Sequence, residues 1–516
     1  MFSGYFKMKT KIVVVGGGTA GWITLAYLAA TTDAELVIVH SNEIDIIGVG
    51  ESTTPTIKNI ADAIGLDEHT WMRDSHATYK YGIEFKNYNK IGSDWRHAYN
   101  DLLPGQTYQS PLFDFGKHAF EKQTTSAQYF LTQRKLQGAK YDVMHYDKSH
   151  GGCSFLTDNR LSPIGLDGKI NFSSYHKYSY HVNAHAFGES MRKHTDSTRF
   201  TEIQATITNV QYNDHGVQYL ELDNGQTIQG DVYVDCTGFK RLLISKLTEY
   251  VPHKKLLNNA AVWGQVKGYN SDRPSTVSTA QDSGWIWEIP TWGQMGSGHV
   301  YCNDFCTEQK AIDTISEYWQ TQGREWIHNK SVKFQSGRLR ETACKNVIAN
   351  GLGQSFIEPL EATSIMITCV TAMNIAKLYN KRKDWTAQTS KVLATYMDQF
   401  IESTMEFVAA HYTLSDRQDT EYWRAYDRTG AVEHISSLIE KQLERGWAAP
   451  NETTLNGYNW INMLVGYNKP YLGKLPTFSK QEVDNYEFYT KQLIDNYEWL
   501  YKNNQTISSR LKVIHE

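Results

Sequence analysis

Residues 11–22, KIVVVGGGTAGW, decide the fold. The β-branched run at 12–15 predicts a buried strand and leads directly into the pattern Gly16-x-Gly18-x-x-Gly21, which an apolar helical pattern follows at once. In such a strand-turn-helix context Gly16 permits the turn, Gly18 lets a pyrophosphate approach the backbone, and Gly21 allows helix and strand to pack closely. The diphosphate of a dinucleotide would then lie at the helix N-terminus.

A second strand at residues 36–40 completes a βαβ unit, which favours dinucleotide binding over an ordinary glycine-rich turn. Where the fingerprint expects an acid for the ribose 2′-hydroxyl, this chain has His40, and Asn42 or Glu43 could take that role instead. An apolar strand at residues 232–234 is expected to return the chain beside the first strand, although a core could demand that strand without any cofactor. The pattern therefore predicts an α/β fold.

Composition narrows the class of protein. A chain of 516 residues exceeds the usual size of a single core, so a further layer or domain is expected. A net charge of −4 with both signs interspersed argues against nucleic acid or an anionic membrane as a partner. A mean hydropathy of −0.52 argues against a membrane span, and no secretory signal is apparent, so we expect a cytoplasmic location. Cys302-x-x-x-Cys306 lacks the second pair of a zinc site, so no metal is expected.

Residues 76–88, HATYKYGIEFKNY, alternate in the manner of one continuous strand. Lys80 shares a side with Thr78, Gly82 and Glu84, opposite the aromatic and aliphatic residues. On this pattern alone Lys80 is predicted to lie on a solvated face.

Three further stretches have both a plain and a functional interpretation. Residues 48–56, GVGESTTPT, suit backbone contact with a planar cofactor or form a mere turn. Trp285 and Trp287, two apart on a strand, lie on one face, which usually means core packing. A helix is expected to start near Thr363, where the backbone amides of Thr363 and Ser364 would form a natural anion site or simply the first turn.

Together these stretches resemble the flavin-dependent halogenases of the tryptophan-halogenase family. The matches run in order from Lys11 to about Ile367, with a weaker one around Trp460. GGGTAGW is similar to the family's FAD motif, GVGESTTP to its flavin loop, and VDCTGFKRLLI to its second FAD-side strand. WIWEIP and FIEPLEAT are the most specific stretches, the former separating this family from related flavin monooxygenases. The family commonly has Ser and Gly where this chain has Ala362 and Ser364.

By this resemblance Lys80 corresponds to the catalytic lysine and Glu361 to the active-site glutamate, which reverses the interpretation of Lys80 from its pattern. Reduced FAD and oxygen would oxidise a halide to hypohalous acid, Lys80 would present the halogen to an aromatic ring, and Glu361 would help to remove the ring proton. The implied cofactor-binding residues are Gly16, Gly18, Thr19, Ala20, Gly21, His40, Gly50, Ser52, Gly238 and Gly351; the halide site is Thr363 and Ser364; the wall between flavin and substrate is Trp285, Trp287, Ile289 and Pro290; and the candidate substrate pocket is Tyr99, Tyr458 and Trp460.

The resemblance also implies the architecture: a Rossmann-like FAD-binding domain of the flavin monooxygenase type with an inserted β-rich substrate region and a helical C-terminal subdomain. The expected boundaries are 8–385 for the FAD module, with about 90–175 and 255–335 on the substrate side, and 386–516 for a mainly helical subdomain that covers the substrate. No pair of NAD(P)H signatures is visible, so a separate flavin reductase is expected to bind transiently and supply reduced FAD. A homo-oligomer is compatible with the sequence.

Two alternatives stay open at this point. A single-component FAD-dependent aromatic monooxygenase shares the glycine signatures, and a non-catalytic flavin-binding interaction protein would need neither Lys80 nor Glu361. Within the halogenase interpretation, we find no Tyr-Tyr pair followed by Glu of the kind that resembles the amino-acid clamp of strict tryptophan halogenases. We therefore expect a permissive enzyme for electron-rich indoles, phenols or pyrroles that favours bromide and iodide over chloride.

Overall fold

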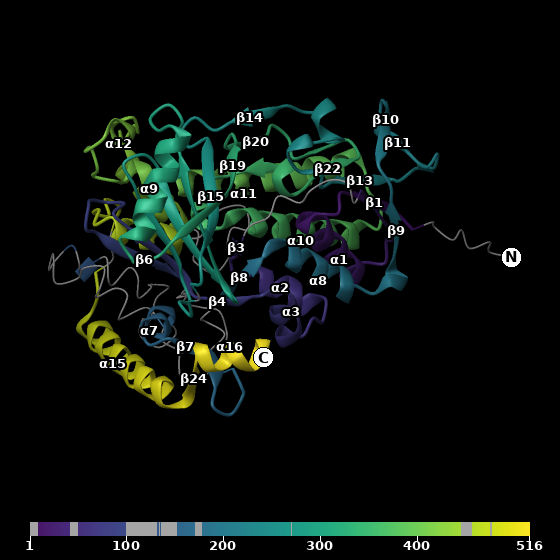
Figure 1. The fold of residues 1–516 in the computed structure, drawn as a ribbon. Coiled ribbons are helices and arrows are strands. Elements are labelled where there is room, and N and C mark those ends of the chain that lie inside the picture. The colour runs from purple at the N-terminus through teal and green to yellow at the C-terminus, as the bar shows by residue number, and fades with distance from the viewer. Residues whose placement is uncertain are drawn as a thin grey trace. The chain divides into compact units, whose positions relative to one another are not determined.

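The computed structural model describes residues 9–41, 50–99, 132–133, 135, 152–170, 178–269, 271–444, 457–474 and 477–516 (Figure 1). Asn42 and Glu43, the sequence alternatives to His40, lie outside these residues. The chain forms two compact units, each drawn from three stretches. Unit 1 comprises Met1–His76, Val182–Lys254 and Gln335–Glu402, and unit 2 comprises Ala77–His181, Lys255–Phe334 and Ser403–Glu516.

Unit 1 combines a central sheet with helices and two small sheets. Its elements are β1 (Lys11–Val15), α1 (Thr19–Thr31), β2 (Glu35–His40), β3 (Gly50–Ser52), α2 (Thr56–Ala63), α3 (Glu68–Asp74), α8 (Ala184–His194), η2 (Ser197–Arg199), β9 (Phe200–Gln204), β10 (Ile207–Asn213), β11 (Gly216–Leu222), β12 (Thr227–Ile228), β13 (Val232–Asp235), η3 (Gly238–Lys240), η4 (Ile244–Lys246), β14 (Tyr250–Pro252), β20 (Gly337–Leu339), β21 (Ala343–Cys344), β22 (Val347–Ala349), η5 (Gly351–Gly353), β23 (Ser355–Phe356), η6 (Pro359–Glu361) and α10 (Thr363–Arg382).

Unit 2 combines a larger sheet with several helices. Its elements are β4 (Thr78–Lys80), β5 (Gly82–Lys86), β6 (Asp94–Ala98), α7 (Gly152–Asp158), β7 (Leu161–Gly165), β15 (Ala260–Val266), β16 (Thr276–Ala280), β17 (Trp285–Thr291), β18 (Gln294–Tyr301), α9 (Glu308–Gln320), β19 (Trp326–Lys333), α12 (Glu421–Arg424), α13 (Ala431–Glu444), α14 (Gly457–Gly466), α15 (Lys480–Asn503), β24 (Asn504–Thr506) and α16 (Ile507–His515). β8 (Ser179–Asn183) and α11 (Ala387–Thr413) begin in one unit and end in the other.

The sheet of unit 1 has the strand order β21-β22-β13-β1-β2-β9. All neighbouring strands run parallel except the edge pair β21–β22, and β1 lies between β2 and β13, with Val14 opposite Ile38 on one side and Val234 on the other. The predicted strand-turn-helix unit and the predicted return of the chain beside the first strand are both confirmed. α1 packs against α8 and α10, completing the helical layer (Figure 1).

Alternate residues of the central strands form the core on one side of this sheet. Val13 and Val15 pack together with Leu220 of β11, so the β10–β12 sheet closes that face. At the carboxyl end of β13, the fully buried Asp235 accepts hydrogen bonds from the amide and hydroxyl of Thr237 and from the backbone amides of residues 243 and 244, at 2.6 to 3.0 Å. A buried charge requires such partners, and here they also shape the loop that follows the strand.

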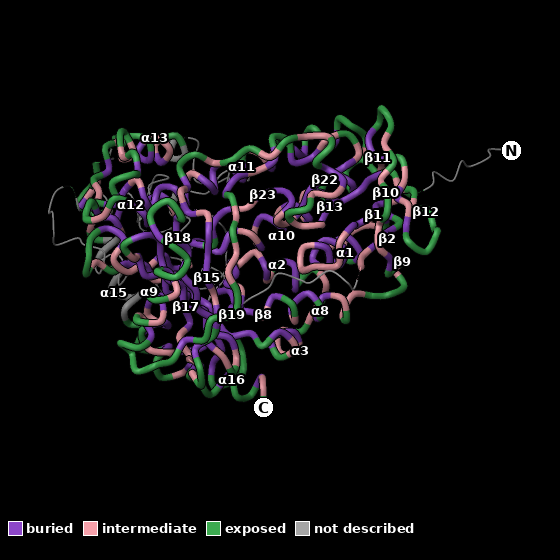
Figure 2. Tube along the Cα trace, turned by 45° about the horizontal axis from the view of Figure 1, so that its top comes forward, coloured by how far each residue is buried: buried purple, intermediate pink, exposed green. Residues whose placement is uncertain are grey.

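The sheet of unit 2 has the order β19-β15-β18-β17-β16-β5-β6. Its strands are antiparallel apart from the pair β16–β5, and α9 packs against β15, β18 and β19 (Figure 1). Ile315 and Trp319 of α9 meet Val262 and Ile286 in the core beneath the helix. Every residue of β17 is buried, which Figure 2 shows as a continuous purple segment.

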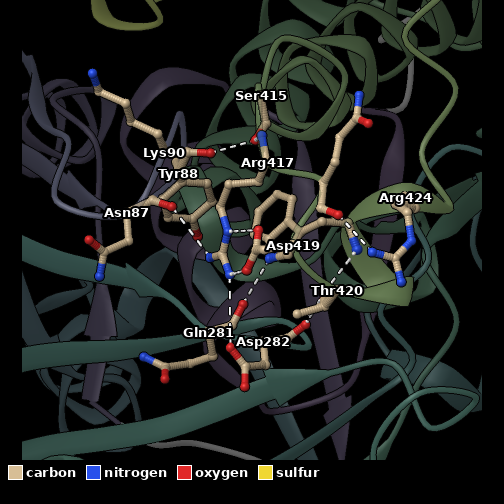
Figure 3. A network of polar contacts seen from close by, with 12 residues as sticks. Asn87, Tyr88, Lys90, Gln281, Asp282, Ser415, Arg417, Asp419, Thr420 and Arg424 are labelled. Carbon is tan, nitrogen blue, oxygen red and sulfur yellow. Dashed lines mark hydrogen bonds and ion pairs between the residues drawn. The ribbon is translucent and has the colours of Figure 1, made fainter.

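A buried arginine joins three separate stretches of unit 2 (Figure 3). Arg417 donates to both carboxylate oxygens of Asp419, at 2.9 and 2.7 Å, and to the backbone oxygen of Asn87 at 3.4 Å. Its guanidinium also lies 3.9 Å from the carboxylate of Asp282, and Thr420 donates to the backbone of the same residue. The bidentate pair with Asp419 fixes the orientation of the guanidinium. The contact of that guanidinium with Asn87 then joins the β5–β6 turn to the segment before α12.

Within the described residues, no helix is both long enough and apolar enough to cross a membrane.

Candidate active site

The turn between β1 and α1 distinguishes glycines that the fold requires from one that it does not. Gly16 has φ = 114°, and an added Cβ would lie 2.5 Å from the backbone oxygen of Cys236; at Gly21 the Cβ would lie 1.9 Å from the oxygen of Gly16. Gly18 has φ = −76°, and an added Cβ would meet no atom of the described residues within 4 Å. The fold tolerates a side chain at Gly18, so the open space there fits a diphosphate rather than the protein's own packing.

The N-terminus of α1 has neither a capping side chain nor an acidic residue in its first turn. Its cap, Gly18, offers no side-chain hydrogen bond, its first turn holds no acidic residue, and the hydroxyl of Thr19 is directed away to the oxygen of Ala184 at 3.0 Å. Backbone donors at such a helix start carry a partial positive charge that favours an anion. This is the arrangement that the diphosphate of FAD requires.

Gly238 and Gly351, which are distant in sequence but were assigned to the same cofactor site, lie near this turn. An added Cβ at Gly351, which has φ = 73°, would lie 2.6 Å from the Cβ of Ala20. Gly238 lies next to the same short helix η5, since a Cβ at Gly353 would lie 3.1 Å from the backbone oxygen of Gly238. Residues from the first, second and third stretches of unit 1 therefore lie close together at this turn.

His40 lies at the end of β2 and next to the glycine turn, where a Cβ on Gly17 would be 2.7 Å from its ring. Its Nε2 is 2.8 Å from Glu202 of β9, and Arg192 donates to the same carboxylate at 3.0 Å. Burial opposes ionisation of Glu202, but these hydrogen bonds more than offset it and lower the pKa of the carboxyl. The carboxylate of Glu202, which is 162 residues later in the chain, thus lies next to His40, the residue that replaces the expected acid.

β3 carries Gly50 and Ser52 on either side of Glu51. Burial raises the pKa of the Glu51 carboxyl from its ordinary 4.5 to about 7. The folded protein binds this proton more tightly than the unfolded chain does, so protonation of Glu51 stabilises the fold. This contribution to the free energy of unfolding is complete below the unfolded pKa and is lost as pH rises through about 7.

We therefore expect the melting temperature of the wild-type protein to fall more between about pH 5 and about pH 8 than that of Glu51→Gln, which cannot ionise. Differential scanning fluorimetry across this range measures the difference. Parallel curves for the two proteins would show that Glu51 ionises without a penalty.

Lys80 is completely buried in unit 2, so the prediction of a solvated face was wrong. The alternating stretch is two strands rather than one. β4 pairs with β8, placing Lys80 opposite Ser179, whereas β5 pairs with β16 and β6. Tyr81 separates them, with its amide donating to the oxygen of Pro274 at 2.7 Å. All three residues of β4 are buried, so the strand has no face open to solvent.

Thr78 links β4 to the tryptophan-containing strand β17. Its hydroxyl donates to the oxygen of Pro290 at 2.6 Å and lies 3.3 Å from Nδ1 of His181, whose Nε2 is 3.0 Å from the hydroxyl of Thr276. Burial, with a contribution from the charge of Lys80, lowers the pKa of His181 well below its usual range, so the ring is neutral. Because the Thr78 hydroxyl donates its proton to Pro290, it can only accept a hydrogen bond from His181. The neutral ring therefore carries its proton on Nδ1 and donates from there. The sequence alone did not single out Thr78 or His181 as neighbours of the tryptophan-containing strand.

Tyr99 is the candidate pocket residue that the structure brings to Lys80. Lys80 Nζ donates to its hydroxyl and lies 4.9 Å from the centre of its ring. Trp460, by contrast, belongs to the core, because it is 1% exposed and packs edge-on against Phe407 with ring centres 5.0 Å apart. Tyr458 lies in α14, and its side chain is outside the described part of the structure.

Trp285 and Trp287 lie on one face of β17 as predicted, with ring centres 6.1 Å apart and planes at 58°. Gly298 on the neighbouring strand makes room for the second indole, since a Cβ there would lie 2.1 Å from it. Ile289 and Pro290 continue the strand, and all four side chains are buried.

The segment before α10 belongs to unit 1. Glu361, at the end of η6, is 5% exposed, and Ala362 then takes a left-handed conformation with φ = 55° before the helix starts at Thr363. The predicted helix start is confirmed. The buried hydroxyl of Thr363 has no hydrogen-bond partner among the described residues, and the first turn holds no acidic residue. Together with Ser364, this helix start fits an anion.

Comparisons with known proteins agree over most of the chain. The sequence model of the tryptophan halogenase family matches residues 11–475. Tryptophan 7-halogenase RebH of Lentzea aerocolonigenes is 31% identical over 448 residues, which is 83% of this chain and 81% of that protein. Tryptophan 6-halogenase ThaL of Streptomyces albogriseolus is 30% identical over 455 residues, covering 84% and 82%.

A solved structure shows the same fold. Tar14, a tryptophan C-6 flavin-dependent halogenase (chlorinase) from taromycin biosynthesis, matches with a TM-score of 0.81 and 24% identity over 98% of this chain and 100% of that one. The parallel sheet with its glycine turn accords with a Rossmann-type flavoprotein. The chain therefore belongs to the tryptophan halogenase family and is a flavin-dependent halogenase, an oxidoreductase.

Proposed function

We propose that this enzyme halogenates electron-rich aromatic or heteroaromatic small molecules, of the indole, phenol or pyrrole type, through Lys80. The observation that carries the proposal is the complete burial of the Lys80 amine, on a strand that Thr78 ties to the motif strand β17. Burying an amine is costly, and proteins accept that cost mainly where the group has a task.

The cofactor proposal rests on unit 1. The backbone around Gly18 and the start of α1 would hold the diphosphate of FAD, Gly238 and Gly351 would let it lie close, and Glu202 or His40 would bind the ribose. Bound reduced FAD supplies, with oxygen, the two-electron oxidation that converts halide to hypohalous acid. We infer that a separate flavin reductase delivers the reduced cofactor, that the enzyme acts in the cytoplasm, and that residues 386–516 help to cover the substrate.

Lys80 would donate an N–H to the hypohalous acid, or carry the halogen as a haloamine, and so present an electrophilic halogen to the ring. Trp285 and Trp287 would keep the ring from the flavin. Glu361 as carboxylate would stabilise the cationic ring and take its proton.

Glu361→Gln is expected to slow halogenation by about 10² to 10⁴, because the amide can neither accept the ring proton nor balance the positive charge. Single-turnover product formation under a fixed supply of reduced FAD measures this effect. Oxygen consumption and FAD retention serve as controls and should match the wild type. An unchanged rate would remove Glu361 from the mechanism.

The halide site proposed at Thr363 and Ser364 consists of helix-start amides with the buried Thr363 hydroxyl. Diffuse partial charge discriminates anions by size more than by chemistry, while oxidation becomes easier from chloride to iodide. With equal chloride, bromide and iodide and an electron-rich phenol, we expect brominated and iodinated products to exceed chlorinated ones by mass spectrometry. Mainly chlorinated product would contradict this preference and leave the halogenase assignment intact.

The identity of the ring is a separate question, and free tryptophan is the second candidate, because the relatives RebH and ThaL are named as tryptophan halogenases. The test is a panel of indoles, phenols, pyrroles and tryptophan with reduced FAD and each halide. We expect several simple rings to react; turnover confined to tryptophan would replace the permissive proposal. A parallel reaction with NADPH alone should give no product, whereas hydroxylated product would indicate a single-component monooxygenase.

A further inference from the structure

We propose that Tyr99 is itself a halogenation site of this enzyme: when no substrate ring is present, the halogen delivered at Lys80 is transferred to a carbon ortho to the Tyr99 hydroxyl. This inference rests on the proposed function, since it needs the hypohalous acid which that reaction makes. It concerns a covalent modification of the chain rather than of a substrate.

The geometry of the pair points to the ortho carbons. Lys80 Nζ donates to the Tyr99 hydroxyl and lies 4.9 Å from the ring centre. In a phenol the two ortho carbons flank the hydroxyl, so the amine stands at the edge of the ring that carries them. Those carbons are also the positions that a phenol oxygen activates toward electrophiles. A halogen on or beside Nζ therefore has an activated ring carbon as its neighbour.

The backbone holds the Tyr99 ring in this place. Tyr99 directly follows β6, where Ala98 lies opposite Gly82. Its amide donates to the oxygen of Tyr81 at 2.8 Å, and its own oxygen accepts from Sγ of Cys153 at 3.4 Å. Gly82 permits the close approach of the strands, because a Cβ there would lie 2.5 Å from the oxygen of His97. Tyr99 thus occupies a fixed position beside Lys80.

The aromatic residues adjacent to Lys80 in sequence do not share this position. Tyr79 and Tyr81 alternate with Lys80 along the strand direction, and both are completely buried. The hydroxyl of Tyr81 donates to the oxygen of Leu161 at 2.9 Å, so its ring is engaged elsewhere. Tyr99, in contrast, is only partly buried.

The step balances without any further reactant. One hypohalous acid, with its halogen at the +1 state, reacts with one ring C–H: the carbon–halogen bond forms and the C–H bond breaks. The ring carbon is oxidised by two electrons and the halogen is reduced to the halide level. The released proton joins the hydroxide of the hypohalous acid as water. If Lys80 first becomes the haloamine, that water leaves earlier and the ring proton returns to the amine.

The test is peptide mapping of the full-length enzyme after reaction with photoreduced FAD, oxygen and bromide, without substrate. We expect a monobromo isotope doublet on Tyr99, with Tyr79 and Tyr81 unmodified. Tyr501, which is 61% exposed, reports hypobromous acid that escapes into solution and should remain unmodified. Tyr99→Phe should show no bromine at this position, and Lys80→Met should lose the modification of Tyr99. Adding an electron-rich phenol should lower it, because the two rings compete.

Three results would overturn the inference. Unmodified Tyr99 in a preparation that brominates added phenol means that the inference is wrong while the proposed function stands. Equal bromination of Tyr99 in wild type and Lys80→Met, or bromination of Tyr501 to the same extent, means that free hypobromous acid is responsible. Bromination of neither Tyr99 nor any added ring, with oxygen still consumed, refutes the proposed function and the inference with it.

Discussion

Lys80→Ala is expected to abolish halogenation of every substrate ring while oxygen consumption with reduced FAD continues. The buried amine is the group proposed to hold and polarise the halogen, and the loss of such a preorganised donor costs about 10²–10³ in rate, with more expected if a covalent haloamine is required. The proposed FAD site lies in unit 1, whereas Lys80 belongs to unit 2, so we expect the flavin reaction not to need this side chain. An oxygen electrode and product mass spectrometry on the same samples separate the two steps.

Lys80→Met is the matched control for packing. Methionine retains most of the buried volume and removes the charge, so the variant should be at least as thermostable as wild type and as inactive as Lys80→Ala. Activity in Lys80→Met with inactivity in Lys80→Ala would mean that a cavity, not the amine, causes the loss. Halogenation at the wild-type rate in both would refute the catalytic role.

Gly18→Val is expected to lose FAD while the fold stays intact. An added Cβ at this position meets no atom of the described residues within 4 Å and φ is −76°, so we expect the fold to accept valine. The same side chain would occupy the space proposed for the diphosphate, and we expect affinity to fall at least about 100-fold, which is about 3 kcal/mol. Titration of the apoprotein with FAD, followed by flavin fluorescence, measures the loss.

Gly21→Ala serves as the contrasting variant. Its Cβ would lie 1.9 Å from the oxygen of Gly16, so this substitution should lower the melting temperature as well as FAD binding. Gly18→Val should leave the melting temperature of the apoprotein near that of wild type. Normal FAD retention in Gly18→Val would refute the placement of the diphosphate.

Local signals made much of unit 1 predictable. The strand, glycine turn and helix at residues 11–31 are specified by neighbours in sequence, and so is the start of α10 at Thr363. The position of β13 beside β1 followed from an apolar strand and knowledge of the βαβ pattern. These features are encoded within a few residues of where they occur.

The environment of Lys80 was not predictable in this way. Alternation assumes an unbroken strand with one open face, but Tyr81 bonds to Pro274 and the two halves join different sheets. Both sheets depend on strands from other parts of the chain. The contact of Lys80 with Tyr99 and that of His40 with Glu202 have the same origin, because nothing near either residue signals its partner.

The interleaving of the two units has a consequence for biosynthesis. β1 emerges from the ribosome with one parallel neighbour, β2, but its other neighbour, β13, pairs residue 12 with residue 232. At about 5–20 residues per second, translation of the intervening chain takes on the order of tens of seconds, during which an apolar strand edge remains open. β22, the neighbour of β13 on its other side in the sheet, begins more than 110 residues after β13 ends. We therefore expect shortened versions that end before residue 347 to aggregate, because they lack the β21–β22 edge of the unit 1 sheet.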